Sequence, residues 1–279
     1  MSNPKVFITE QGTRYLKESG VVLLSRPSVD LSGMSAFLED LNFSEYLNDP
    51  TELASGAQLC KTAGQLCYMS FGEKRTKNDN AEKYFEHIKE AYHGSVLEHA
   101  NYSVLLYGVS RSQTHELITH RFLSKSQVSQ RYVSGNLLRF VERPEYQDDE
   151  ELHAMFEERI DKTFKEYHII AGKLLERQKA GNKILIADIK TDLRKKVNQA
   201  ARSVLPNETE APCIVTTNIR AWRHIIESRA HIGAEIEIRA LAMKVFHLLQ
   251  STEPILFADY TVEGLADGTE AVRTEYRKV

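Results

Sequence analysis

Apolar residues recur every three or four positions along several segments of the chain, which is the spacing of an amphipathic helix. The longest such segment covers residues 148–179, where Leu152, Met155 and Phe156 begin the apolar face that we expect to point inward. The predicted helices are residues 53–68, 80–92, 148–179, 187–204, 219–229 and 234–250.

Strands are predicted between these helices. Residues 102–109 are almost continuously apolar and β-prone, which is typical of a central strand covered on both faces. Residues 136–142 alternate as a second strand, and residues 214–217 form a short one that leads into Asn218, a residue able to cap the next helix. The first 50 residues predict a strand or two and a small helix. With no Pro-, Gly- or Ser-rich linker, the sequence predicts one α+β domain over residues 1–279, a twisted β-sheet core flanked by long α-helices.

The segment 115–133 departs from both patterns. Its apolar residues do not sustain a helical period, so we expect a short helix that unwinds into a polar loop. Planar guanidinium groups, hydroxyls and an amide can together bind an anion and a base. A solvated surface loop is the alternative. The polar side chains in question are Arg121, Ser124, Gln127, Ser129 and Arg131.

A second pattern lies in the predicted helix 219–229. Trp222, Ile225 and Arg229 fall on one helical stripe, which places a guanidinium where burial is expected. A buried guanidinium needs a partner, because leaving it unpaired costs several kcal/mol. The partner is either an internal carboxylate, such as Glu235 or Glu237, or a ligand. Arg220 and His224 lie one turn apart on the adjacent face and could meet the same ligand.

Composition narrows the class of protein. A net charge of −3 argues against a general nucleic-acid or membrane-surface binder. Three cysteines without a CxxC pair argue against a disulfide framework and fit a reducing cytoplasm. Cys60 and Cys67 lie on one side of the helix 53–68 and are expected in the core. We find no signal-peptide pattern and no apolar run long enough to span a membrane.

The known metal- and nucleotide-binding motifs give little indication of function in this sequence. His115 and His120 are five positions apart, about 140° around a helix, so they do not form the metal pair of a zincin. A metal site dispersed over those histidines and His93, Glu98 and His99 stays open, although ten histidines produce chance clusters. Neither a Gly-x-Gly-x-x-Gly fingerprint nor a P-loop is present.

The polar segment nevertheless resembles a known signature. The flavin-dependent thymidylate synthases carry Arg-His-Arg-x-x-Ser-x-x-x-x-Ser-x-Arg, and residues 119–131 read THRFLSKSQVSQR. Further stretches resemble the same family in the same order, so the resemblance covers about residues 66–260. They are HGSVLEHA from His93, SRSQTHEL from Ser110, ARSVLPNETE from Ala201 and TNIRAWRHIIESRA from Thr217.

The resemblance implies a homotetramer in which FAD and dUMP meet at subunit interfaces. It implies reductive methylation of dUMP, with methylenetetrahydrofolate as carbon donor and NADPH as reductant of the flavin, and it implies no metal. The implied flavin-site residues are Ser95, Glu98, Thr119, His120, Arg121, Gln127, Asn218, Arg220 and His224. The implied dUMP ligands are Arg111, Glu116, Gln127, Ser129, Arg131, Arg202 and Arg229, with Arg229 polarising the uracil. No enzyme nucleophile is expected, because the cofactor carries the chemistry.

One position departs from the signature. Thr119 stands where the family has its first arginine, so a cation expected near flavin and nucleotide is missing. A compensating cation such as Lys125 is one explanation, and an impaired form is another. The alternatives to the synthase are therefore a nucleotide- and flavin-binding homologue with reduced turnover and a histidine-carboxylate metal hydrolase acting on nucleotides.

Overall fold

The fold is known from a computed structural model that describes residues 3–48, 51–72, 80–133, 135–181, 190–277 and 279. Two compact units make up the chain. Unit 1 comprises Met1–Gly20, Leu106–Thr119 and Lys125–Ile214, and unit 2 comprises Val21–Leu105, His120–Ser124 and Val215–Val279. Helices and strands occur in both, which confirms the predicted α+β class. The single domain over residues 1–279 stays a prediction.

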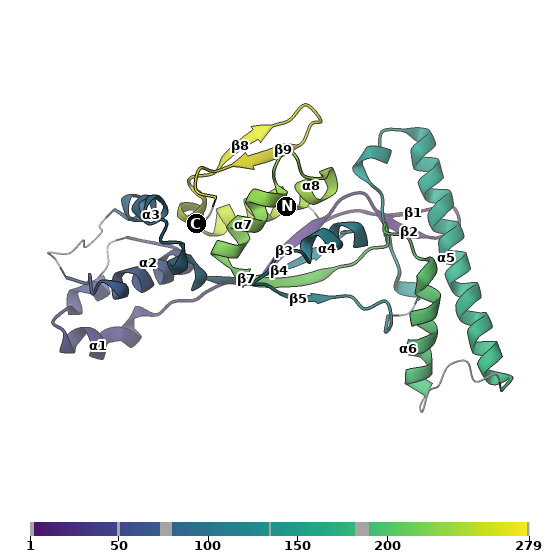
Figure 1. The fold of residues 1–279 in the computed structure, drawn as a ribbon, viewed down its shortest axis with the longest axis horizontal. Coiled ribbons are helices and arrows are strands. Elements are labelled where there is room, and N and C mark those ends of the chain that lie inside the picture. Colours follow the sequence, from purple (N-terminus) through teal and green to yellow (C-terminus); the bar gives the residue numbers. More distant parts are fainter. Residues whose placement is uncertain (1–2, 49–50, 73–79, 134, 182–189, 278) are drawn as a thin grey trace. The chain divides into compact units, whose positions relative to one another are not determined.

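Most helices and strands are labelled in Figure 1. The helices are α1 (Ser35–Asp40), α2 (Ser55–Cys67), α3 (Ala81–Glu90), α4 (Arg111–Leu117), α5 (Glu150–Lys179), α6 (Lys190–Ala201), α7 (Ile219–Arg229) and α8 (Ile236–Thr252). The strands are β1 (Val6–Ile8), β2 (Arg14–Leu16), β3 (Gly20–Ser25), β4 (Asn101–Tyr107), β5 (Ser124–Gln127), β6 (Phe140–Val141), β7 (Cys213–Asn218), β8 (Thr261–Gly264) and β9 (Glu270–Arg273). Short 3-10 helices include η3 (Gly94–Glu98), η6 (Arg202–Val204) and η7 (Pro254–Phe257).

Side-chain caps fix where the helices begin. The predicted caps are confirmed: the Asn80 side chain accepts from the backbone N–H of Lys83, and that of Asn218 accepts from Ala221. Asp149 accepts from two N–H groups in the first turn of α5. Each cap satisfies donors that the first helical turn leaves without an intrahelical partner.

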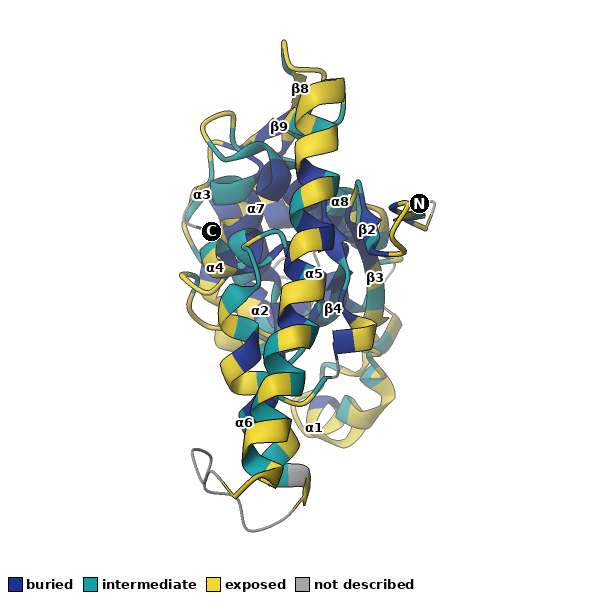
Figure 2. Cartoon of the chain, turned by 90° about the vertical axis from the view of Figure 1, so that its right-hand side faces the viewer, coloured by how far each residue is buried: buried dark blue, intermediate teal, exposed yellow. Residues whose placement is uncertain are grey.

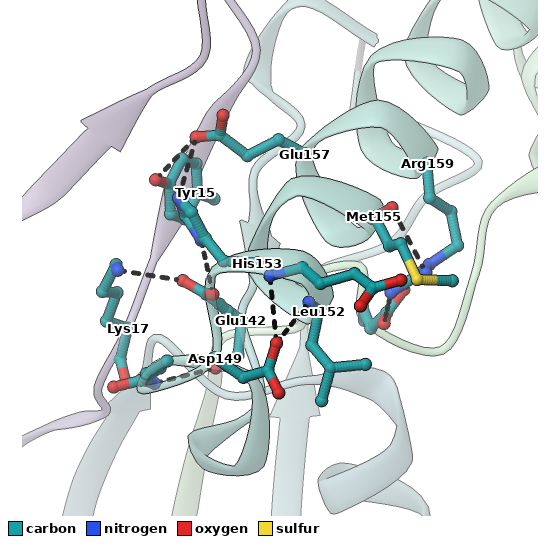
Figure 3. A network of polar contacts seen from close by, with 12 residues as sticks. Tyr15, Lys17, Glu142, Asp149, Leu152, His153, Met155, Glu157 and Arg159 are labelled. Carbon is teal, nitrogen blue, oxygen red and sulfur yellow. Dashed lines mark hydrogen bonds and ion pairs between the residues drawn. The ribbon is translucent and has the colours of Figure 1, made fainter.

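Unit 1 contains a three-stranded sheet in the order β1-β2-β6, with β2 and β6 parallel. Tyr15, Phe140, Phe156 and Ile160 pack together and hold this sheet to α5. Figure 3 shows the polar contacts beside them. Glu142, fully buried, pairs with His153 at 2.7 Å and with a lysine of the N-terminal segment at 3.3 Å. The sheet and α5 are therefore joined by both apolar and polar contacts.

Helix α5 buries a narrower stripe than its sequence predicts. Phe156, Ile160 and Tyr167 are buried, but Leu152 and Met155, predicted to point inward, are 37% and 53% exposed. Figure 2 shows exposed residues along most of the length of α5, with buried ones confined to one side. The periodic pattern predicts the helix correctly. Which of its apolar residues are buried depends on how much of the helix surface the neighbouring elements cover.

A four-stranded sheet has the order β3-β4-β7-β5. Strand β4 is an inner strand, as predicted, but it covers Asn101–Tyr107 rather than residues 102–109. Tyr102, Val104 and Leu106 are buried on one face, and the other face is covered only in part. Around the part of this sheet in unit 2, α7 packs against α8 and η3, and α8 packs against η7. Trp222 on α7 donates its indole N–H to the carbonyl of Tyr102 at 3.4 Å. The sheet thus fixes the position of α7.

Several sequence predictions are wrong in detail. The second strand is limited to Phe140–Val141 rather than residues 136–142, and the supposed polar loop contains strand β5. Cys60 is buried, but Cys67 is exposed at the end of α2. Of the helix predicted over 187–204, α6 and η6 are observed, and residues 187–189 lie outside the described residues.

Candidate active site

Helix α7 positions a row of polar side chains in unit 2. Asn218 caps the helix, and Arg220 and His224 follow one turn apart. Arg229 ends the helix and is partly exposed. The prediction that Arg229 is buried with the apolar residues of this helix is therefore only partly right, because its side chain is partly exposed.

Arg229 and two histidines come together. The Nε–H of Arg229 donates to Nε2 of His120 at 2.9 Å. The ring of His120 meets that of His224 edge-on, with centroids 5.6 Å apart and planes at 73°. The His120–Arg229 contact joins residues 109 positions apart in the sequence. Three residues that the sequence singled out are thus adjacent in space.

The electrostatics of His120 follow from this arrangement. Burial, and then electrostatic interactions with Arg229 and His224, lower the pKa of His120 to about 4. At neutral pH the imidazole is uncharged, and because Nε2 accepts the arginine N–H, its proton lies on Nδ1. His120 can therefore orient Arg229 without cancelling its charge.

The chain between His120 and Ser124 is held in an unusual conformation. Phe122 has a φ of 60°, in the left-handed region, and its side chain is 86% exposed. Its carbonyl accepts a hydrogen bond from the Thr217 hydroxyl at 2.5 Å. Arg121 is exposed beside it. The contact from Thr217 on β7 fixes the segment that carries His120 and Arg121.

Helix η3 supplies a second group of implied flavin residues. Ser95 and Glu98 are exposed on η3, and Glu98 pairs with Arg220 at 2.6 Å. Gly94 allows this approach, since a Cβ there would lie 2.9 Å from Nε of Arg220. Ser95, Glu98, Arg220 and the histidine pair all belong to unit 2.

In unit 1, α4 carries Arg111 and Glu116, both partly buried. Ser110 caps this helix by accepting from Gln113 N at 3.1 Å. Thr119 is exposed just beyond the helix, and its hydroxyl donates to the carbonyl of Glu116 at 2.7 Å. The threonine that replaces the signature arginine thus contributes to closing the helix end and supplies no cation.

The end of the signature forms a tight turn in unit 1. The Ser129 hydroxyl accepts from the backbone N–H of Arg131 at 3.4 Å, and the Asn198 amide on α6 donates to the Arg131 carbonyl at 3.2 Å. Gln127 lies on β5 and Arg202 begins η6, and both are partly buried. Ser129, Arg131 and Arg202 therefore stand on short, anchored segments of one unit.

The sequence reading missed Arg223, the buried arginine of α7. Its side chain is 1% exposed and pairs with Asp259 through two contacts, of 2.9 and 2.8 Å. It also donates to the carbonyl of Val279 at 2.9 Å. Burial alone would raise the pKa of Asp259, but Arg223, Thr274 and Lys89 lower it to about 2. Since Asp259 is 36 positions away, no local pattern could have indicated the pair.

Neither a cluster of metal ligands nor a membrane-spanning helix is found in the described part of the chain. There, no group of three or more His, Cys, Asp or Glu side chains is arranged to hold a metal ion. None of the helices in the described ranges is long and apolar enough to cross a membrane.

Known proteins are similar in sequence to most of this chain. The family described as thymidylate synthase complementing protein matches residues 51–255. A flavin-dependent thymidylate synthase of Mycolicibacterium gilvum (strain PYR-GCK) is 43% identical over 220 residues, covering 79% of this chain and 86% of that protein. The enzyme of the same name from Mycobacterium tuberculosis (strain ATCC 25177 / H37Ra) is 42% identical over 221 residues, with the same coverage of 79% and 86%. This chain therefore belongs to the family of flavin-dependent thymidylate synthases.

Proposed function

We propose that this protein converts dUMP to dTMP by reductive methylation, with FAD as its cofactor, methylenetetrahydrofolate as carbon donor and NADPH as reductant. Membership of the family supports the conversion of dUMP to dTMP. The carbon donor, the reductant and the roles of individual residues are our own assignments. We further propose a cytoplasmic homotetramer with active sites at subunit interfaces.

The contact of Arg229 with His120 is the observation that carries the proposal. The neutral imidazole of His120 accepts a 2.9 Å hydrogen bond from Arg229. This contact holds the positively charged guanidinium in one orientation. Fixed donors aimed at developing charge contribute strongly to catalysis, because they need no reorganisation during the reaction. We assign Arg229 to the uracil, where it stabilises negative charge on the ring and favours ionisation at N3.

The donor set of unit 2 fits a flavin nucleotide. Arg121 and Arg220 supply cations for a diphosphate, the His120 and His224 rings can contact an isoalloxazine edge, and Asn218 supplies an amide. Ser95 and Glu98 complete the implied set, and both are accessible on η3. Bound FAD would supply the hydride of the reductive step, while the protein binds and orients it.

The residues of unit 1 fit a nucleoside monophosphate. Arg111, Arg131 and Arg202 offer guanidinium groups suited to phosphate oxygens. The remaining assigned ligands of dUMP, which offer amide, carboxylate and hydroxyl groups, are Glu116, Gln127 and Ser129. Ser129 is assigned as a ligand rather than a nucleophile: its hydroxyl accepts from the local backbone, and activation would require a base in contact with it.

The alternative of a binding homologue with reduced turnover rests on Thr119. Its hydroxyl is engaged with the Glu116 carbonyl and brings no positive charge. Both readings predict a yellow protein that takes up FAD. They differ in turnover, because only the synthase forms dTMP.

Absorption spectra of the purified protein, before and after addition of FAD, test the flavin assignment. We expect flavin bands that bleach with NADPH in the absence of oxygen. A protein that takes up no FAD would overturn the proposal. The variant R220M should retain less FAD, because it lacks one of the cations assigned to the flavin. The control variant K162M, at an exposed lysine of α5, should retain as much FAD as the unmodified protein.

A further inference from the structure

Lys125 lies among the residues assigned to dUMP but is not part of the family signature. It occupies the second position of β5, and Gln127 follows two positions later. Alternate residues of a strand point to the same face. Ser124 and Ser126 are exposed, whereas Lys125 and Gln127 are both partly buried, so these two share the covered face of β5.

The ammonium group of Lys125 reaches α4. Its Nζ donates to the carbonyl of Thr114 at 3.2 Å. That carbonyl also accepts the backbone N–H of Ile118, so it is satisfied within the helix without the lysine. Arg111 lies one turn before Thr114 on the same helix. The lysine therefore lies against the helix that carries Arg111 and Glu116.

The charges around Lys125 are those of an anion site. Burial lowers the pKa of Lys125, and the nearby charge of Arg111 lowers it further. The neighbouring Cys213 thiol is neutral at pH 7, because burial raises its pKa to about 11. Among the described residues, the contact of Lys125 is a carbonyl oxygen and not a carboxylate. Two cations held close together in a partly buried place are stabilised by an anion bound to both.

We propose that Lys125 and Arg111 together bind the phosphate group of the nucleotide substrate. The family signature has an arginine where this chain has Thr119. Lys125, six positions after Thr119, supplies a cation to the site that lacks that arginine. Lysine binds phosphate as a point charge and does not need the planar geometry of arginine. The inference rests on the proposed function, since it assigns a ligand to the same substrate.

The test compares the variants K125M, K125R and K162M in the FAD-loaded protein. Methionine keeps the apolar stem of the lysine and removes its charge, and K162M is the matched loss of an exposed lysine in unit 1. The dissociation constants of dUMP and of deoxyuridine, which lacks the phosphate, are measured for each. We expect K125M to weaken dUMP binding about 10- to 100-fold and to change deoxyuridine binding by less than about twofold. K125R should recover most of the loss, and K162M should show none.

Three results would overturn the inference. If dUMP and deoxyuridine binding fall in parallel together with Tm, Lys125 acts only by holding β5 to α4. If K125M lowers the affinity for FAD but not that for dUMP, Lys125 contacts a phosphate of the flavin instead of the nucleotide substrate. If K125M binds dUMP as the unmodified protein does, Lys125 contacts no phosphate. A failure of the proposed function is recognised separately, because the unmodified protein would then bind no dUMP.

Discussion

Arg229 donates its Nε–H to Nε2 of His120 at 2.9 Å, and the imidazole that accepts it is neutral at physiological pH. A histidine ordinarily titrates near pH 6.5 and could then repel the arginine. Burial prevents this here, so the orientation of the guanidinium persists across the physiological range. The consequences can be measured at each residue of the pair.

Replacing Arg229 by glutamine should lower kcat/KM for dUMP about 10²- to 10³-fold, as removal of one preorganised charge-stabilising donor does in other enzymes. FAD retention should change little, because Arg229 is assigned to the uracil. Steady-state kinetics and flavin absorbance are the measurements. Activity within a few-fold of the unmodified enzyme would show that Arg229 does not polarise the base.

His120 should make stability depend on pH. Its pKa is lowered from 6.5 to about 4, so between these values the unfolded chain binds more protons than the folded one. The contribution of a neutral His120 is complete above about pH 6.5 and is lost as the pH falls toward 4. The difference in Tm between the unmodified protein and H120N should therefore shrink as the pH is lowered through this window. A difference that is constant from pH 7 to pH 4 would contradict the assignment.

The buried pair of Arg223 and Asp259 should be essential to stability. R223M leaves the Asp259 carboxylate, 6% exposed, without its bidentate partner, and removal of one member of such a pair costs about 3–5 kcal/mol. Urea denaturation measures the loss. As a control, K196M breaks the surface pair of Lys196 and Asp192 on α6, whose side chains are 36% and 30% exposed, and should cost less than about 1 kcal/mol. Equal losses in the two variants would show that burial does not set the strength of the pair.

Restoring the signature arginine with T119R should increase retention of FAD or dUMP. A charge-assisted hydrogen bond is worth about 1.5–3 kcal/mol, or roughly 10- to 100-fold in affinity. Equilibrium dialysis of both proteins is the measurement. Equal retention of both FAD and dUMP would contradict the expectation that the missing arginine weakens binding.

Local signals predicted the elements that carry the site. Asn218 was expected to cap α7 and does, and β4 was expected to be central because its residues are apolar on both faces. Strand β5 was missed because Ser124–Gln127 contains no apolar alternation, and it lies at the edge of its sheet, where polar side chains are tolerated.

Contacts between distant segments could not be predicted. His120 meets Arg229 across 109 positions, and Arg223 meets Asp259 across 36, and neither spacing is periodic. For the same reason the sequence did not indicate that Arg223, rather than Arg229, is the buried arginine of α7: its partners are Asp259 and the carbonyls of Leu256 and Val279, all distant in the sequence. Spacing singled out the polar segment 115–133 and the arginines of α7, and the resemblance to the family supplied the role assigned to each residue, which stays a prediction.

The most direct test of the function is anaerobic dTMP formation by the FAD-loaded protein, prereduced with NADPH, when dUMP and methylenetetrahydrofolate are added together. We predict that dTMP appears as the flavin absorbance returns, and that omission of either substrate abolishes the product. A protein that holds reduced flavin and binds dUMP, yet forms no dTMP, would contradict the account and identify the chain as a binding homologue.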